Sequence, residues 1–276
     1  MQKTLKNSVK LAGIGLHSGA AVNLQLLPAV ANTGIVFRRI DLDPVVDIRV
    51  SPEKITEALL CSALVVGDVK VATIEHLMAA FAALEIDNVI VELDAAEVPV
   101  MDGSSADFVF AINSVGFVEQ EFERHYIKVT NSVRIEEGDK FVELLPAEHG
   151  LSFEISVDFP HPVIAATPQT IEFDLTAAGF EKTVCRARTF GLASDLEKLH
   201  ANNLGLGASL DNAIGIGDDK VLNSEGLRYK DEFVRHKLLD AIGDLYVAGP
   251  IIGKFRAHKP GHALNNQLLR RFLSLK

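Results

Sequence analysis

The stretch "RHKLLDAIGDLYVAGPIIGKF", residues 235–255, has the pattern of a helix followed by a strand. Residues 75–93, "EHLMAAFAALEIDNVIVEL", repeat this order, and both helices open with a charged residue and a histidine. A second pair shares Leu-Pro-Ala: "VNLQLLPAVANTGIVFRR", residues 22–39, and "KFVELLPAEHGLSFEIS", residues 140–156. Similarities this short can arise by chance, but their common order predicts an internal duplication.

The spacing of the two matches predicts where the halves differ. Pro28 and Pro146 are 118 residues apart, whereas His76 and His236 are 160 residues apart. The second half should therefore hold about 42 additional residues. Residues 184–217 are the natural place for this insert.

The pattern of elements predicts an α+β fold, because short alternating strand patterns occur together with apolar helical patterns. A charged stretch at residues 119–126 indicates a boundary between an N-terminal domain, residues 1–122, and a C-terminal domain, residues 123–276. Strands are expected within residues 21–29, 32–40, 88–94, 126–138, 140–147 and 151–159. Helices are expected at residues 72–85, 104–115, 192–201, 229–247 and 262–274.

The composition is that of an ordinary soluble globular protein, with 48% hydrophobic and 23% charged residues. The net charge of -10 argues against a nucleic-acid-binding protein that works by bulk charge. Cys61 and Cys185 lie far apart and outside any CxxC spacing, which fits a reducing compartment. With no secretory signal and no long apolar run, we expect a cytoplasmic protein without stable membrane insertion. We also expect a monomer.

One stripe of the helix expected around residues 231–246 is polar between apolar neighbours. His236, Asp240 and Asp244 are four residues apart and share a face. A solvated helix face would explain them, but such a face is usually broad, and here it is narrow. The alternative is a buried metal or catalytic stripe, because His and Asp at i, i+4 can bind one ion together.

The duplication adds a histidine on another helix to the candidate metal ligands. If the halves are related, the helices that contain His76 and His236 can face each other. His76, His236 and Asp240 would then offer three ligands that zinc accepts and leave a fourth position open. A closed structural site would need a fourth ligand, often cysteine, so a catalytic zinc site is favoured.

Two further side chains are candidates for acid–base chemistry. Glu75 precedes His76 but points in another direction, so it could take a proton from water without binding the metal. Without a metal nearby it would be an ordinary glutamate in the first turn of a helix. His262 follows Gly261 at a helix start and could donate a proton, although a structural or surface role explains it equally well. Asp244 could keep His262 protonated by pairing with it.

Four motifs occur in this order along the chain: "TIEHLMAAFAALEIDNVIVELDAAEVPVMDGSSADF", "RARTFG", "DEFVRHKLLDAIGDL" and "GHALNN". Together they closely resemble the zinc-dependent UDP-3-O-acyl-N-acetylglucosamine deacetylase family of Gram-negative bacteria, and the similarity runs along essentially the whole chain. The resemblance implies removal of the 2-acetamido acetyl group from UDP-3-O-(3-hydroxyacyl)-N-acetylglucosamine, with release of acetate, in lipid A biosynthesis. It also implies two related domains, each a β-α-α-β sandwich with an insert, the second insert forming a hydrophobic passage for the acyl chain.

The resemblance also implies a role for each matching residue. Zinc would be held by three residues: His76, His236 and Asp240. Glu75 resembles the general base and His262 the general acid, with Asp244 behind it. The implied substrate contacts are Thr189 for the oxyanion, Lys237 for the substrate, Lys259 for the diphosphate, Phe159 for stacking on uracil, and Phe190, Leu192, Leu196, Leu210 and Ala213 for the acyl passage.

Two other functions remain open from the sequence. One is a zinc amidase that acts on a different acylated amine. The other is a non-catalytic protein that binds zinc or a sugar nucleotide. Glu75 and His262 discriminate between catalysis and binding, because binding alone needs neither a base nor an acid.

Overall fold

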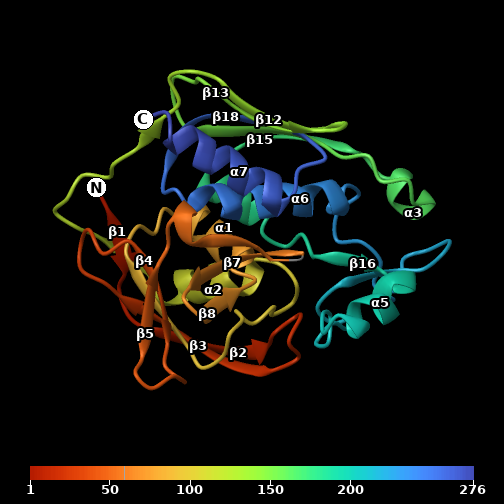
Figure 1. Ribbon diagram of the computed structural model, residues 1–276, viewed down its shortest axis with the longest axis horizontal. Coiled ribbons are helices and arrows are strands. Elements are labelled where there is room, and N and C mark those ends of the chain that lie inside the picture. Colours follow the sequence, from red (N-terminus) through yellow and green to blue (C-terminus); the bar gives the residue numbers. More distant parts are fainter. Residues whose placement is uncertain (59) are drawn as a thin grey trace.

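A computed structural model describes residues 1–58 and 60–276 of the chain (Figure 1). Two sheets form the outer layers, and the long helices lie between them. The expected α+β class is confirmed. In each half a sheet forms the outer layer and the helices form the inner layer. The helices of the two halves pack against each other, so the layers follow the order β-α-α-β across the whole molecule.

The first sheet has the strand order β2-β3-β9-β4-β5. Its strands are β2 (Val9–Ile14), β3 (Ala21–Pro28), β4 (Ile35–Arg39), β5 (Val46–Arg49) and β9 (Val89–Leu93). The central strand β9 is antiparallel to β3 and parallel to β4. In β4 and β9 buried and half-buried residues alternate, as expected for a sheet with one face toward the core.

The second sheet repeats this arrangement in the order β12-β13-β18-β14-β15, with β11 also paired to β18. Its strands are β11 (Ile127–Lys128), β12 (Val133–Glu137), β13 (Lys140–Leu145), β14 (Leu151–Ser156), β15 (Thr170–Asp174) and β18 (Ile251–His258). Its central strand β18 is antiparallel to β13 and parallel to β14. The shared order and strand directions agree with the duplication predicted from the sequence.

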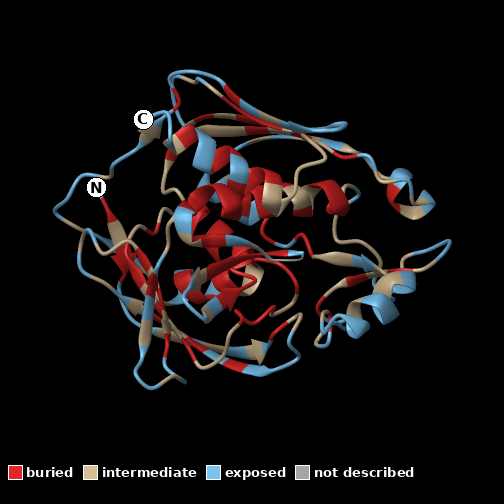
Figure 2. Cartoon of the chain, in the orientation of Figure 1, coloured by how far each residue is buried: buried red, intermediate tan, exposed pale blue. Residues whose placement is uncertain are grey.

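The helices between the sheets form the core of the molecule. They are α1 (Glu75–Leu84), α2 (Ala106–Val115), α6 (Glu232–Tyr246) and α7 (His262–Leu273). Figure 2 shows that many residues of these central helices are buried, and all ten residues of α1 are buried. Within the described part of the chain, no helix is long and apolar enough to cross a membrane.

Each half carries an additional segment outside this common arrangement. In the first half it is a small sheet of β6 (Ile55–Ala58), β7 (Cys61–Val66) and β8 (Val69–Ala72), after a 3-10 turn at Pro52–Lys54. In the second half it includes α4 (Ala177–Thr183), β16 (Phe190–Leu192), a 3-10 turn at Ala193–Asp195, α5 (Leu196–Ala201) and β17 (Ile214–Ile216). The remaining short elements are β1 (Lys3–Leu5), β10 (Phe117–Glu119) and α3 (Pro162–Ala165).

Several expected helix boundaries were too wide. The helix expected from residue 72 begins at Glu75, because Thr73 has a φ of 58°, which an α-helix does not accept. The helix expected from residue 192 begins at Leu196, because Leu192 pairs with Ile216 between β16 and β17. Backbone pairing with a distant strand therefore overrides the local helical pattern there.

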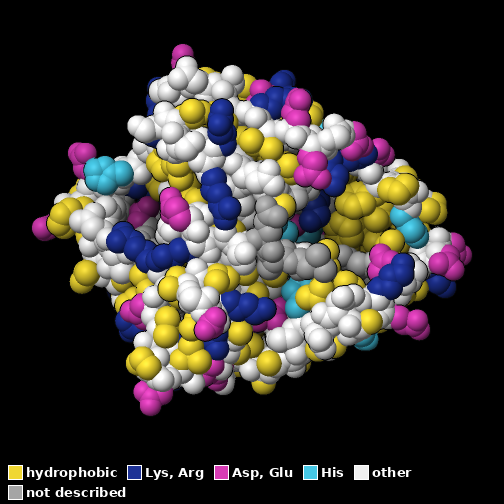
Figure 3. Space-filling model, viewed as in Figure 1, with side chains coloured by type: hydrophobic (Ala, Val, Ile, Leu, Met, Phe, Trp, Pro, Cys, Tyr) yellow, Lys and Arg dark blue, Asp and Glu magenta, His cyan; other side chains and the backbone are white. Residues whose placement is uncertain are grey.

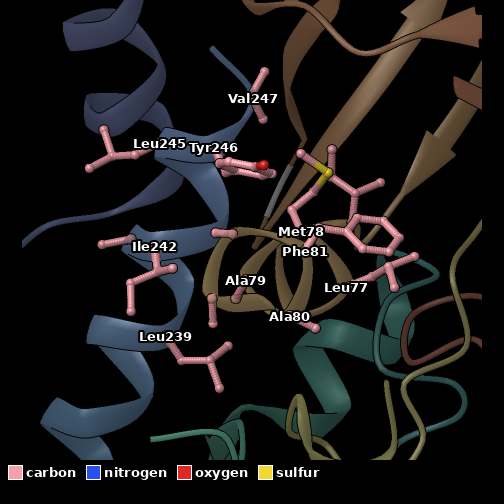
Figure 4. Close-up of a cluster of buried hydrophobic side chains, with 14 of the residues drawn as sticks. Leu77, Met78, Ala79, Ala80, Phe81, Leu239, Ile242, Leu245, Tyr246 and Val247 are labelled. Carbon is pink, nitrogen blue, oxygen red and sulfur yellow. The ribbon is translucent and has the colours of Figure 1, made fainter. Parts of the chain in front are cut away.

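The two halves approach most closely where α1 crosses α6. A Cβ atom added to Gly243 would lie 2.0 Å from the carbonyl oxygen of Glu75, so only glycine allows this crossing. Figure 4 shows the apolar side chains around it, from Leu77 to Phe81 on α1 and from Leu239 to Tyr246 on α6. The absence of one side chain thus lets the start of α1 lie against the C-terminal part of α6.

Gly243→Ala is expected to destabilise the fold by about 1–3 kcal/mol, because the new methyl group must push backbone apart in a close-packed interior. For a chain of this size that corresponds to a fall of several degrees in Tm. Thermal unfolding checks this, with Gly191→Ala as the control, since no atom lies within 4 Å of its added Cβ. An unchanged Tm in Gly243→Ala would contradict the close approach.

Candidate metal centre

Helices α1 and α6 bring His76, His236 and Asp240 into one buried cluster. The Nε2 atoms of His76 and His236 lie 3.6 Å and 3.3 Å from Asp240 Oδ1. The two imidazole rings meet edge to face, with their centroids 5.0 Å apart. In the described residues, these three side chains form a group whose ligand atoms all lie within 4.8 Å of one another. Their burial excludes the solvated helix face as an explanation.

The donor atoms of this cluster fit a divalent metal ion. Asp240 Oδ1 is buried and has no hydrogen-bond partner in the part of the chain that the structure describes, which is costly for a carboxylate without a ligand. His236 Nδ1 lies 3.0 Å from the carbonyl oxygen of Ala187, which can only accept, so Nδ1 carries the proton and Nε2 is free for a metal. Burial lowers the pKa of His236 to about 3, so its ring is neutral at pH 7.

A lysine keeps the Asp240 carboxylate charged. Lys237 Nζ donates a hydrogen bond to Asp240 Oδ2 at 2.7 Å. Burial alone would raise the pKa of Asp240, but interactions with His236, when its ring is protonated, and with Lys237 bring the pKa well below its ordinary range. Because His236 is neutral at pH 7, Lys237 supplies the positive charge beside Asp240 there. Burial also opposes the charge on Lys237, yet Asp240 raises the pKa of Lys237 above its ordinary value. One oxygen of Asp240 is therefore paired and the other faces the two histidines.

Glu75 and His262 lie beside each other at this cluster. Glu75 Oε1 is 3.8 Å from His262 Nε2, and Asp244 Oδ2 is 2.9 Å from His262 Nδ1. Burial lowers the pKa of His262, but the charges of Asp244 and Glu75 outweigh burial and raise it to about 9. Burial raises the pKa of Glu75 by more than the neighbouring His262 lowers it. The sequence-predicted acid, base and pairing carboxylate thus meet in space.

The segment that contains Thr189 is fixed on both sides by backbone hydrogen bonds. Thr189 N–H donates to the Gly103 carbonyl, and Ile214 N–H donates to the Thr189 carbonyl, each at 2.8 Å. The next residue, Phe190, packs edge to face against Phe159, and its ring centroid lies 6.2 Å from that of His236. Thr189, Phe190 and Phe159 therefore lie on the insert side of the metal cluster.

The insert of the second half exposes apolar side chains. Leu196 and Leu210 are 39% and 47% exposed, whereas Leu192 is half-buried against a small core that contains Ile214 and Ile216. Ala213 is half-buried. Figure 3 shows hydrophobic side chains gathered around a hollow near β16, between α3 and α5. Leu196 and Leu210 therefore do not belong to a buried core, and a contiguous exposed apolar patch is typical of a binding surface.

Lys259, the predicted diphosphate contact, is paired with two carboxylates of the protein itself. Its Nζ contacts Asp139 Oδ2 at 2.5 Å and Asp158 Oδ2 at 2.9 Å. The hydrogen bonds that Lys259 donates to Asp139 and Asp158 raise the pKa of Lys259. A diphosphate would have to compete with these two exposed carboxylates for the lysine.

Three residues beside the cluster were missed by the sequence analysis. Ser62 contacts Glu75 and Asp244, and Arg188 forms a buried ion pair with Glu232 at 2.9 Å that fixes the start of α6. Burial lowers the pKa of His17, and the charge of His262 lowers this pKa further. Among the described residues, the two ring nitrogens of His17 have no hydrogen-bond partner. A lone histidine or serine in a loop or strand has no periodic signal, so the pattern gave no reason to choose them.

Cavities also occur far from this cluster. One of about 430 Å³ lies at the far ends of α1 and α6, where Arg124, His149, Thr176 and Tyr246 are among its lining residues. Another of about 430 Å³ lies over β14, β15 and β18. Their linings carry none of the predicted site residues, so cavity volume alone does not locate the chemistry.

Comparison with known proteins identifies the family. The family model described as LpxC, UDP-3-O-acyl N-acetylglycosamine deacetylase, matches residues 2–274. The chain belongs to this family. The chain that carries these motifs, two related sheets and the His–His–Asp cluster is therefore a member of a family of deacetylases.

Individual relatives agree along nearly the full length. A protein of Idiomarina loihiensis named UDP-3-O-acyl-N-acetylglucosamine deacetylase is 51% identical over 275 residues, which is 99% of this chain and 90% of the relative. One of Marinobacter nauticus with the same name is 54% identical over 271 residues, covering 98% of this chain and 89% of the relative. A third, from Hahella chejuensis, is 51% identical over 276 residues, covering 100% and 91%.

Proposed function

We propose that the chain removes the N-acetyl group from UDP-3-O-(3-hydroxyacyl)-N-acetylglucosamine in lipid A biosynthesis, with zinc as its metal. The observation that carries this proposal is the buried His76, His236 and Asp240 cluster with Glu75 and His262 at its side. Family membership supports the substrate class. The cluster supports a metal-assisted reaction, because its donors are those that zinc accepts in open catalytic sites.

His76, His236 and Asp240 would hold the ion. When bound there, zinc would polarise the acetyl carbonyl and stabilise negative charge on its oxygen. The oxygen also needs a donor from the protein, and we assign that role to the Thr189 hydroxyl. Lys237 stays charged beside Asp240 and would attract the substrate from the same side.

Hydrolysis of the amide requires two proton transfers. Glu75 takes a proton from water as the water oxygen adds to the acetyl carbon. The C–N bond then breaks, and His262 gives its proton to the leaving nitrogen, so that acetic acid and a free amine result. The acetic acid loses its proton to water and leaves as acetate. Asp244 makes the proton transfer from His262 possible because it keeps His262 charged before the reaction. Proton balance is restored when Glu75 releases its proton and His262 regains one.

The substrate would extend from this cluster over the insert of the second half. Phe159 would stack on the uracil ring, and Lys259 would contact the diphosphate once it leaves Asp139 and Asp158. The acyl chain would lie on the insert along Phe190, Leu192, Leu196, Leu210 and Ala213. The domain division at residues 1–122 and 123–276, with the passage at about 184–217, belongs to this proposal. The monomeric state and cytoplasmic location stay predictions from the sequence.

The direct test is acetate release from the acylated UDP-sugar by purified protein, with and without a chelator. Turnover that the chelator abolishes and added zinc restores would support the proposal. Hydrolysis of other acylated amines at the same rate would instead favour a general zinc amidase. Binding of the sugar nucleotide without acetate release would contradict the enzymatic function.

Removal of the acyl chain from the substrate should lower kcat/KM by several orders of magnitude. Burial contributes about 0.8 kcal/mol per methylene, so about ten methylenes on the apolar insert could dominate binding. Comparing acetate release from the acylated substrate and from UDP-N-acetylglucosamine measures this. Equal turnover of the two substrates would mean that the exposed leucines of the insert do not bind the acyl chain.

Asp244→Asn should move the basic limb of the pH profile to lower pH. His262 must be charged to act as an acid, so activity is present below its pKa of about 9 and is lost as pH rises through that value. Without the Asp244 charge the pKa of His262 should fall by about 1–2 units. The profile of kcat/KM between pH 6 and 10 measures the shift. A limb at the wild-type position would show that another group supplies the proton.

A further inference from the structure

Ser62 lies in β7, fully buried between the two groups assigned to proton transfer. Its backbone N–H donates to Glu75 Oε2 at 3.2 Å, and its hydroxyl donates to Asp244 Oδ1 at 2.6 Å. Asp244 in turn accepts from His262 Nδ1. One residue therefore contacts Glu75 directly and His262 through a single carboxylate.

We propose that Ser62 is a positioning residue for the deacetylation, which holds the base Glu75 and the acid's partner Asp244 in a fixed relation. This inference rests on the proposed function. Ser62 and Glu75 come from the first half, whereas Asp244 and His262 come from the second, and Ser62 and Asp244 are 182 positions apart in the sequence. The serine therefore links the halves at the place where base and acid meet.

The hydroxyl also affects how strongly Asp244 binds the His262 proton. The buried carboxylate accepts three hydrogen bonds, from Ser62 Oγ, His262 Nδ1 and Asn265 Nδ2. A hydrogen bond to the charged form of a carboxylate stabilises that form, so the carboxylate interacts less strongly with its other donors. Without the hydroxyl, Asp244 should bind the imidazolium more strongly, and His262 should become a weaker acid.

The other charged or titratable groups around His262 do not depend on this hydroxyl. They are Glu75 on α1, whose Oε1 lies 3.8 Å from His262 Nε2, Asp240 on α6, and His17 in the loop after β2. A substitution that removes only the hydroxyl leaves their charges in place. Any movement of the basic limb then reports the Ser62–Asp244 contact.

Ser62→Ala tests the inference in the zinc-loaded full chain. We expect kcat/KM to fall by about tenfold, the size of one hydrogen bond to a charged group, with zinc content unchanged. We also expect the basic limb to move to higher pH, which is opposite to the shift of Asp244→Asn. Ser62→Cys, close in shape but a weak donor, should shift the limb in the same direction by less. Titration of His262 by histidine NMR should show the same order.

Ser104→Ala is the matched control. Ser104 is also fully buried, and its hydroxyl donates at 2.7 Å to a carboxylate, that of Asp102, which pairs with Arg228. This variant should leave the basic limb in place even if it lowers stability. If Ser62→Ala does not fold, Ser62→Cys carries the test with the same readouts.

The outcomes separate this inference from the function on which it rests. If wild-type protein releases no acetate, the proposed function fails. If the wild type is active but the limb and the His262 titration stay in place in the Ser62 variants, Ser62 has only a structural role and the inference is wrong. The same limb movement in Ser104→Ala would also overturn it, because the effect would then be general.

Discussion

His76→Ala is expected to lose bound metal and deacetylase activity together. The variant removes one of three ligands, and the remaining pair, His236 and Asp240, lies on a single helix that cannot enclose an ion alone. A metal ion at such a site contributes several kcal/mol to the transition state, so its loss should cost activity by about 10³-fold or more. Elemental analysis of the purified variant and acetate release measure the two effects side by side.

The control for this variant is another histidine replaced in the same way. His149 is exposed and lines the cavity at the far end of α6, so His149→Ala should keep its zinc and its activity. Wild-type protein stripped by a chelator should behave like His76→Ala and recover when zinc is added. Full activity in metal-free protein would rule out a catalytic metal.

Glu75→Ala and His262→Ala should each lower kcat/KM by a factor of about 10²–10⁴ while zinc stays bound, which is the usual contribution of a positioned acid or base. Neither side chain belongs to the ligand group, and the two lie 3.8 Å apart. The wild-type basic limb should disappear in His262→Ala, because the group that titrates there is gone. Rates from pH 6 to 10 and metal content measure both effects.

The double variant tests whether the two residues act in one reaction. Groups that act as a unit are strongly non-additive, so the double variant should lose little more than the worse single variant. Loss of zinc in Glu75→Ala would instead make Glu75 a ligand. A basic limb that stays unchanged in His262→Ala would mean that the acid has been misassigned.

Much of the fold could be predicted from local patterns in the sequence. The Leu-Pro-Ala matches and the repeated helix–strand order predicted two related halves, and the two sheets have the same strand order. The α6 stripe was predictable because residues at i and i+4 of one helix share a face whatever surrounds it. The repeat then placed His76 opposite His236, since equivalent helices of related halves can meet across a pseudo-symmetric interface.

The contacts that complete the site were decided by tertiary structure alone. No periodic sequence pattern predicts that the hydroxyl of Ser62 donates to Asp244. The buried ion pair of Arg188 with Glu232 and the interaction of His17 with His262 have no such pattern either. The sequence did not decide which apolar side chains are exposed for the same reason, and Leu210 lies on the surface although it is a large apolar residue. Helix and strand geometry fixes which residues share a face, but which faces meet depends on how whole elements pack, and Gly243 sets that packing where α1 crosses α6.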